Sequence, residues 1–416
     1  MAARDAVIVG YGGISPLGSD LEHQWRRALA GGSGIGPLSR FALDGDFPVR
    51  IAGQVPDIDG EDYPFLAPRH QAAWSSPVFK YSLLSVAHAL EMSGLEISTD
   101  IEARTAVTYS TAIGGLDAVL QADRKLRSEG KLPHPYANPN SCINMVGGKI
   151  AIEHKARGPI FSPITACATG LTSIIMGAMF LEQGRADVAI CGAVDFALVE
   201  PIVAGFYTMN GVYIAPKGRE SDPPEMASRP FSADRRGFVI SEGAGAVILT
   251  TREFARTHGL SYATELAGWG MTSDAHHFVA PYFDTIRKCM ADAVDDAALA
   301  PADIDAVNAH AASTKVGDKT EYQALRALFG TEMPPVCANK SLIGHAMGAS
   351  SALETIFALK GMEDGMVPPT INYSADPEID IDCVADGKRR LTQEFVLKNS
   401  FGFGGCNACA VFKHSG

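Results

Sequence analysis

Short apolar runs alternate with longer amphipathic segments along most of the chain. The short runs are rich in Val, Ile and Ala and predict strands at residues 6–9, 105–109, 188–191, 246–249, 306–309, 335–338 and 408–412. The longer segments predict helices at residues 80–92, 171–183, 285–298, 321–328 and 349–362. Strands that alternate with helices are typical of βα units, so the pattern predicts an α/β fold with a mainly parallel sheet.

One uncharged stretch, residues 158–181, is long enough to be considered as a membrane span. It contains prolines, glycines and several Ser and Thr residues, and it stands alone. The pattern instead favours a buried strand at 159–164 that leads into a buried helix at 167–183. The N-terminus lacks the apolar core and cleavage site of a signal peptide, so we expect a cytoplasmic protein that is not exported by this end.

Two segments of the chain resemble each other in pattern. Residues 165–170 and 340–345 are both short turns that follow an apolar strand and precede an apolar helix. This repeat suggests two similar halves, 1–253 and 254–416. The alternative is that the echo has no structural meaning, because any α/β chain can contain one.

Composition narrows the classes of function. The chain has 416 residues, of which 46% are hydrophobic, so it can bury a large core and is not a disordered chain. A net charge of −12 argues against binding to nucleic acid or to an anionic membrane, and an acidic partner would need a local basic patch. The eight cysteines are scattered and are typical of reduced thiols rather than of a disulfide framework.

Cys167 is the first candidate for chemistry. It lies between two small residues where a strand gives way to a helix, and the free N–H groups of a helix N-terminus favour a thiolate. Taken alone, it could equally be a buried structural cysteine. His310 follows a predicted strand and His345 lies among glycine and alanine residues, both in turns that a ligand can approach. One Cys and two His in such settings favour a catalytic site over three unrelated core residues.

A glycine-rich segment, residues 399–407, precedes the last predicted strand. Its glycines allow backbone N–H groups to approach a ligand oxygen, although an ordinary turn would look the same. The segment is not a phosphate-binding P-loop, and glycines 10, 12 and 13 do not complete a dinucleotide-binding motif. We expect Cys406 and Cys409 to bind no metal, because a lone CxxC pair lacks the further ligands of a zinc site.

Five motifs together resemble one family: residues 165–167, 229–239, 308–310, 340–345 and 399–405. The sequence is similar, over essentially its whole length, to the elongating Cys-His-His β-ketoacyl-[acyl-carrier-protein] synthases. These belong to the thiolase superfamily, which also includes the ketosynthases of type II polyketide assembly. The resemblance implies a thiolase-like fold, with two similar α/β halves packed as a layered αβαβα unit, and no cofactor beyond the carrier's phosphopantetheine. It also implies a dimer, either of identical chains or with a related subunit.

The resemblance also implies residue roles. Cys167 would accept the acyl chain, while His310 and His345 would stabilise the enolate formed by loss of CO2 from a malonyl thioester. Lys340 would pair with Glu354. The backbone N–H groups of Cys167 and Phe403 would form an oxyanion hole, with Phe403 also acting as a gate. Substrate contacts would come from Ile113, Thr314, Gly402 and Gly404, and carrier docking would involve Arg124, Lys125, Arg127, Lys217 and Arg219.

Two positions depart from the family pattern. Ala312 stands where the family usually has a threonine, and so does Cys406. The resemblance therefore leaves the affinity for pantetheine open, and it does not separate fatty-acid elongation from polyketide or polyene extension. A catalytically weak partner subunit of a ketosynthase heterodimer remains the second hypothesis for function.

Overall fold

The computed structural model describes residues 6–43, 45, 47–58, 63–216, 218 and 222–415. Within them, ten strands form one sheet in the order β10-β9-β13-β14-β8-β1-β7-β6-β4-β5. These strands are β1 (Ala6–Ile14), β4 (Thr105–Ser110), β5 (Ile160–Phe161), β6 (Val188–Phe196), β7 (Glu242–Thr251), β8 (Thr264–Ser273), β9 (Ala306–Asn308), β10 (Val336–Cys337), β13 (Phe395–Gly402) and β14 (Cys406–His414). Two small hairpins pair β2 (Ile35–Pro37) with β3 (Ile51–Gly53) and β11 (Met366–Val367) with β12 (Arg389–Arg390).

Along the chain, the helices lie mainly between these strands. They are α1 (Leu21–Leu29), α2 (Pro68–Ala73), α3 (Pro77–Ser93), α4 (Leu116–Ser128), α5 (Ala137–Ser141), α6 (Met145–His154), α7 (Thr169–Glu182), α8 (Glu200–Thr208), α9 (Arg252–His258), α10 (Phe283–Asp296), α11 (Lys315–Phe329), α12 (Lys340–Ile343) and α13 (Gly348–Asp364). The prediction of an α/β fold is confirmed.

The strand order repeats within the sheet. The first group consists of β1, β4, β5, β6 and β7, and the second of β8, β9, β10, β13 and β14. Numbered 1 to 5 along the chain and counted from the outer edge of the sheet inward, the strands of each group have the order 3-2-4-5-1. The two groups meet where β1 pairs with β8, through Val7 with Glu265 and Ile8 with Thr264. Residue 253, the boundary expected from the sequence, lies in α9, which connects β7 with β8.

The prediction of a mainly parallel sheet is wrong. Parallel pairing is confined to the outer strands, namely β4 with β5 and β6, and β9 with β10 and β13. The central pairs, from β6 through β7, β1, β8 and β14 to β13, are antiparallel. The last strand of each group therefore runs back beside the strand before it, a return that apolar run lengths do not reveal.

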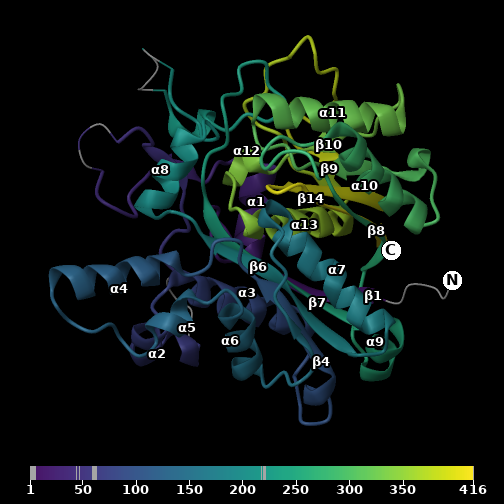
Figure 1. Cartoon of the computed structure of the whole chain (residues 1–416). Helices are drawn as coiled ribbons and strands as arrows, with labels where there is room; N and C mark the ends of the chain where they lie inside the picture. The colour runs from purple at the N-terminus through teal and green to yellow at the C-terminus, as the bar shows by residue number, and fades with distance from the viewer. Residues whose placement is uncertain are drawn as a thin grey trace.

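Two helices, α7 and α13, lie next to each other at the centre of the molecule (Figure 1). One apolar cluster contains residues of both helices together with residues from strands of both groups, including Ile8, Val247 and Ala410. Helix α3 packs on the opposite face of the first group and α10 on that of the second, in two separate clusters. Each group of strands forms one layer of sheet, so the order of layers is helix, sheet, helix, sheet, helix.

Glycines permit the closest helix contacts. A Cβ at Gly10 would lie 2.2 Å from the carbonyl oxygen of Ala89, and one at Gly12 would lie 2.5 Å from that of Ser85. Both carbonyls belong to α3, so these glycines let α3 approach β1. A Cβ at Gly170 would lie 2.6 Å from the backbone nitrogen of Ala352, which places α7 directly against α13.

The prediction for residues 159–183 is right about the helix and wrong about the strand. A short 3₁₀ turn (Ala166–Ala168) precedes α7, whose inner face is buried. The expected buried strand is only β5, and both Ile160 and Phe161 are exposed because β5 is the outermost strand of the sheet. Among the helices of the described residues, none combines the length and apolarity that crossing a bilayer requires.

We expect Gly170→Ala to destabilise the protein by about 1–3 kcal/mol, because the added methyl group must displace the backbone of α13. The midpoint of urea unfolding measures the change. Gly205→Ala is the matched control: Gly205 is also helical, has open space around its Cβ position and should tolerate alanine with a gain of about 0.5–1 kcal/mol. Equal midpoints for the two variants would contradict the packing described for α7 and α13.

Candidate active site

Cys167 lies in the 3₁₀ turn directly before α7. The preceding Ala166 has φ of 48°, a left-handed conformation that is uncommon for residues with a Cβ atom. The turn is held by Thr169, whose hydroxyl donates to Ala166 O at 2.7 Å and accepts from Thr165 N at 3.0 Å. The hydroxyl of Ser400 on β13 donates to Cys167 O at 3.2 Å. The nucleophile candidate is thus fixed by contacts from both groups of strands.

His345 lies in the turn between α12 and α13 and contacts the thiol directly. Its Nε2 is 3.2 Å from Cys167 Sγ, and its Nδ1 is 2.9 Å from the hydroxyl of Ser350. The backbone of His345 donates to Val239 O at 2.7 Å and accepts from Ser241 N at 2.9 Å. These four contacts set the position and the plane of the imidazole.

His310 lies two residues after β9 and completes the cluster. Its backbone N–H donates to Glu321 Oε1 at 2.9 Å, and its carbonyl accepts from Lys340 Nζ. One ligand-type atom from each of Cys167, His310 and His345 lies within 4.8 Å of the others. Thiolates and imidazoles are also zinc ligands, so the absence of a metal from this cluster stays a prediction.

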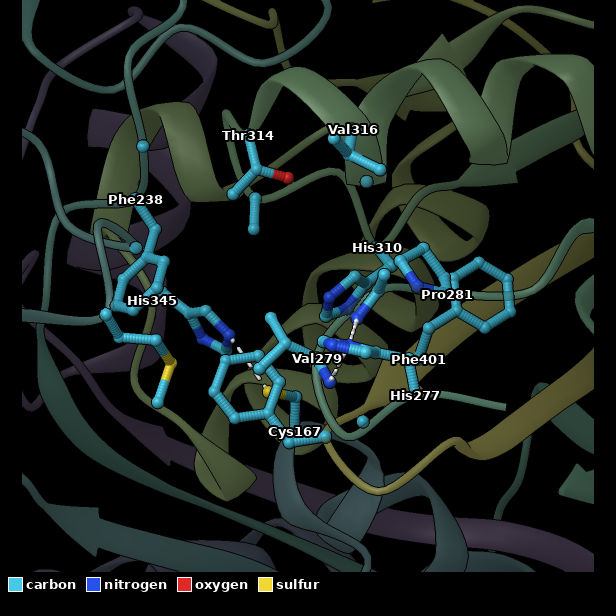
Figure 2. A pocket seen from close by; sticks show the side chains of 18 of the residues that line it. Cys167, Phe238, His277, Val279, Pro281, His310, Thr314, Val316, His345 and Phe401 are labelled. Carbon is cyan, nitrogen blue, oxygen red and sulfur yellow. Dashed lines mark hydrogen bonds between the residues drawn. The ribbon is translucent and has the colours of Figure 1, made fainter. Parts of the chain in front are cut away.

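The three side chains face a cavity of about 500 Å³. In Figure 2, a dashed line marks the contact between Cys167 and His345, and His310 lies across from this pair. Aromatic and aliphatic side chains surround the three residues. Such a cavity suits an acyl chain or a thioester arm. The lining includes Phe238, Val279, Pro281, Ala312, Thr314, Val316, Phe401, Gly402 and Phe403.

A buried group of charges lies behind the histidines. Lys340 donates to Glu354 Oε1, and Lys398 Nζ donates to Glu354 Oε2 at 2.7 Å. Each of these three side chains is 1% exposed or less. Glu321, which holds the backbone of His310, also accepts from Ala311 N at 2.7 Å and from Asn399 Nδ2 at 3.1 Å.

Burial dominates the protonation of the site. It raises the pKa of Cys167 to about 11, against the opposing influence of Lys340 and of the backbone N–H groups of Phe403 and Cys167. The backbone N–H groups thus favour the thiolate as expected, but loss of solvation outweighs them. Burial and then the charge of Lys340 hold the pKa of both His310 and His345 well below the usual range. At neutral pH the site contains a thiol and two neutral imidazoles.

Asp195, at the end of β6, connects the segment after β4 to the turn that carries His345. It accepts from Thr111 Oγ1 at 2.6 Å, Ile113 N at 3.0 Å and Gly348 N at 2.6 Å. Burial raises the pKa of Asp195 to about 6 although these donors favour its ionised form. The carboxylate holds three segments that are distant in sequence, which is why no local motif indicated it.

The structure brings some, but not all, of the candidate residues to the cavity. Thr314, Gly402 and Phe403 line it, whereas Ile113 packs in a neighbouring apolar cluster and the Gly404 backbone N–H donates to Phe278 O at 2.8 Å. Arg124, Lys125 and Arg127 are exposed on α4, which projects from the main body in Figure 1. Lys217 and Arg219 lie outside the described residues.

Sequence reasoning missed Lys398 and His277. Lys398 lies in a run of buried residues on β13, where a lysine is itself a signal, because a buried charge needs a partner. His277 lines the cavity, and its Nδ1 accepts from Val279 N at 3.1 Å and Ala280 N at 3.0 Å. Its position in a loop gives no periodic pattern from which to predict it.

The fold and the site define a class of protein: a thiolase-like acyltransferase. Residues 3–255 match the model of the β-ketoacyl synthase N-terminal domain, and residues 263–374 match that of the C-terminal domain. The chain therefore belongs to the β-ketoacyl synthase family.

Relatives with full-length similarity bear related names. The chain is 35% identical to 3-oxoacyl-[acyl-carrier-protein] synthase 2 of Coxiella burnetii, over 99% of each chain. It is 36% identical to the enzyme of the same name from Rhizobium meliloti, again over 99% of each.

Solved structures agree with this assignment. A β-ketoacyl synthase from Burkholderia phymatum superposes with a TM-score of 0.91 at 27% identity, over 99% of this chain and all of that one. A type II polyketide ketosynthase in complex with its acyl carrier protein gives 0.90 at 26% identity, and the ishigamide ketosynthase/chain length factor gives 0.90 at 29%, each over the full length of both chains. The expected family and thiolase-like fold are confirmed.

We expect alkylation of Cys167 by iodoacetamide to accelerate steadily between pH 7 and pH 10. A thiol whose pKa is about 11 gains thiolate about tenfold per pH unit below that value. Peptide mapping by mass spectrometry in a Cys142→Ser background, which removes an exposed thiol, measures the rate at Cys167 alone. A plateau already reached at pH 7 would show a thiolate and would contradict the effect assigned to burial.

Proposed function

We propose that the protein catalyses decarboxylative Claisen condensation of an acyl thioester with a malonyl thioester held on an acyl carrier protein. The observation that carries this proposal is the contact of Cys167 with His345, beside His310, at the wall of one cavity. The substrates are those of the named relatives, and the product is a β-ketoacyl thioester two carbons longer.

Acyl transfer to Cys167 comes first. The thiol sulfur attacks the carbonyl carbon of the acyl thioester, its proton passes to Nε2 of the neutral His345, and that proton leaves with the carrier's thiol. The backbone N–H groups of Cys167 and Phe403, which act to lower the pKa of the thiol, would donate to the oxyanion that forms. The step exchanges one thioester for another and leaves the acyl chain on the enzyme.

Condensation follows on the same cavity wall. The malonyl carboxylate leaves as CO2, and its bonding electrons form an enolate whose oxygen accepts hydrogen bonds from His310 and His345. The enolate carbon then attacks the carbonyl carbon of the Cys167 thioester and expels the sulfur as a thiolate, which takes up one proton from solvent and restores the thiol. Neutral imidazoles suit this role because each can donate an N–H to the developing charge. His345 acts as a base at Nε2 while its Nδ1 carries the proton, and it donates from Nε2 to the enolate as the other tautomer, in which Nδ1 accepts from the Ser350 hydroxyl.

The second hypothesis, a catalytically weak partner subunit, is less well supported because Cys167, His310 and His345 are all present and adjacent. The names of similar proteins bear on the biosynthetic pathway. The full-length relatives are named 3-oxoacyl-[acyl-carrier-protein] synthase 2, whereas one structural neighbour is a type II polyketide ketosynthase and another is the ishigamide ketosynthase/chain length factor. Ala312 lines the cavity without a hydroxyl, which suggests a pantetheine contact different from that of the family pattern.

We further propose that the protein forms a homodimer through the edge of the sheet at β5. The exposed Ile160 and Phe161 on β5, with exposed Ile164 and Ile152 nearby in sequence, would place apolar side chains in water in a monomer. An unpaired edge strand can add a strand from a second copy. A heterodimer with a related subunit would use the same edge. One structural neighbour, the ishigamide ketosynthase/chain length factor, is named as such a pair.

The carrier would supply the substrates, and no other cofactor is expected. Free thiols at all eight cysteines are consistent with the expected cytoplasmic location.

Variants at Cys167 and His345 should separate the two half-reactions. Cys167→Gln should abolish condensation but retain release of CO2 from malonyl-carrier, because both histidines remain. His345→Ala should lower that release by about 10²–10³-fold, the usual cost of losing one oxyanion donor. Labelled CO2 measures both variants. Loss of release in Cys167→Gln together with normal release in His345→Ala would contradict the proposed roles.

Carrier docking is proposed to involve the exposed cations of α4. Reversing Arg124 and Lys125 to Glu should slow acyl transfer from the carrier, and more so at low salt, because like charges then face an acidic carrier. Alkylation of Cys167 should be unchanged in this variant, and Arg256→Glu on α9 is a matched exposed control. An unaltered transfer rate would exclude this patch.

A further inference from the structure

Lys398 is a second lysine bound to the same carboxylate as Lys340. Its side chain is 0% exposed, and its Nζ donates to Glu354 Oε2 at 2.7 Å and to Asn399 O at 2.6 Å. Lys340 occupies the other oxygen of Glu354. An ammonium without access to water is costly unless it is paired, so a lysine at this point of a central strand calls for an explanation.

The strand pairing places Lys398 close to His310. On β13, Lys398 pairs in register with Asn308 of the parallel strand β9, and His310 follows Asn308 by two residues. Lys340 Nζ bonds both Glu354 and the carbonyl of His310, so one continuous set of hydrogen bonds runs from Lys398 through Glu354 and Lys340 to His310.

The charges around the histidines come from several elements. Lys340 and Lys398 carry two positive charges, which Glu354 between them and Glu321 behind His310 balance with two negative charges. Lys340 and Lys398 both act against protonation of His310 and of His345. The ionisable groups near the two imidazoles are Cys167 in the 3₁₀ turn, Asp195 on β6, Glu321 on α11, Lys340 on α12, Glu354 on α13 and Lys398 on β13.

We infer that Lys398 is a positioning residue of the active site: its charge, shared through Glu354 with that of Lys340, adds to the effect of burial in keeping His310 and His345 neutral and able to donate hydrogen bonds to the enolate. The inference rests on the proposed function for what the histidines do, but not for their protonation. With Lys340 alone, Glu354 and Glu321 would leave one negative charge near the histidines and favour their protonation, whereas the second lysine balances it. The same charge would also attract the enolate as it forms.

Two variants distinguish the charge of Lys398 from its hydrogen bonds. Lys398→Met removes both, whereas Lys398→Gln removes the charge and keeps an N–H donor for Glu354. We expect both variants to raise the pH at which His310 and His345 take up a proton. Titration of protein labelled with ¹⁵N in histidine reads this pH directly, with resonances assigned through His310→Asn and His345→Asn, and needs no turnover. Failure of the proposed reaction would therefore leave this readout intact.

Decarboxylation of malonyl-carrier gives a second readout. In both variants the acid limb of its pH profile should move to higher pH, so the loss of rate relative to the wild type should be greater at pH 6 than at pH 8. Lys149→Met is the matched control, because Lys149 is also a buried lysine paired with a carboxylate, Glu153, but lies on α6. This control should leave both titrations unchanged.

Three results would overturn the inference. Unchanged histidine titration in both variants would show that the charge of Lys398 does not act on the imidazoles. A shift in Lys398→Met alone would assign the effect to the hydrogen bond. Failure of both variants to fold, judged by circular dichroism beside Lys149→Met, would assign Lys398 to stability instead of to the histidines.

Discussion

Glu354 accepts hydrogen bonds from Lys340 and Lys398 inside the protein, and this contact joins the elements that carry the reacting groups. Lys340 begins α12, Glu354 lies in α13 and Lys398 lies on β13. Lys340 also reaches the carbonyl of His310. Removing one member would leave a buried charge without a partner, which is more costly than never having formed the group. The positions of both histidines therefore depend on a neutralised set of charges that water does not reach.

The repeated strand order explains how one site receives residues from distant parts of the chain. The turn before α7 carries Cys167, and the turn before α13 carries His345. Because α7 and α13 pack together in the central layer, their N-terminal turns meet, and Cys167 Sγ comes within 3.2 Å of His345 Nε2. Gly170 allows this approach, since any side chain there would meet the backbone of α13. The nucleophile and its histidine thus come from equivalent places in the two groups of strands.

Much of this arrangement could be predicted from local sequence. Small residues around Cys167, His310 and His345 indicated turns at the ends of elements, and the structure has them there. The direction of the strands could not be read in this way, because a return strand such as β7 has the same apolar run as a parallel one. The influence of the helix N-terminus on Cys167 was visible in the sequence, whereas the depth of burial, which outweighs it, was not. Asp195 bonds Gly348 across 153 residues and Lys398 bonds Glu354 across 44, so only the fold could reveal their partners.

The most direct test of the account follows one acyl group through the reaction. The purified protein is incubated with an acyl-loaded carrier and then with malonyl-carrier, and the intact masses of enzyme and carrier are recorded at each stage. The account predicts that the enzyme first gains the mass of the acyl group at Cys167. On addition of malonyl-carrier it loses that mass, as CO2 is released and the carrier gains a β-ketoacyl chain two carbons longer. An acyl group that never reaches Cys167, or that stays there after malonyl-carrier is added, would contradict the account.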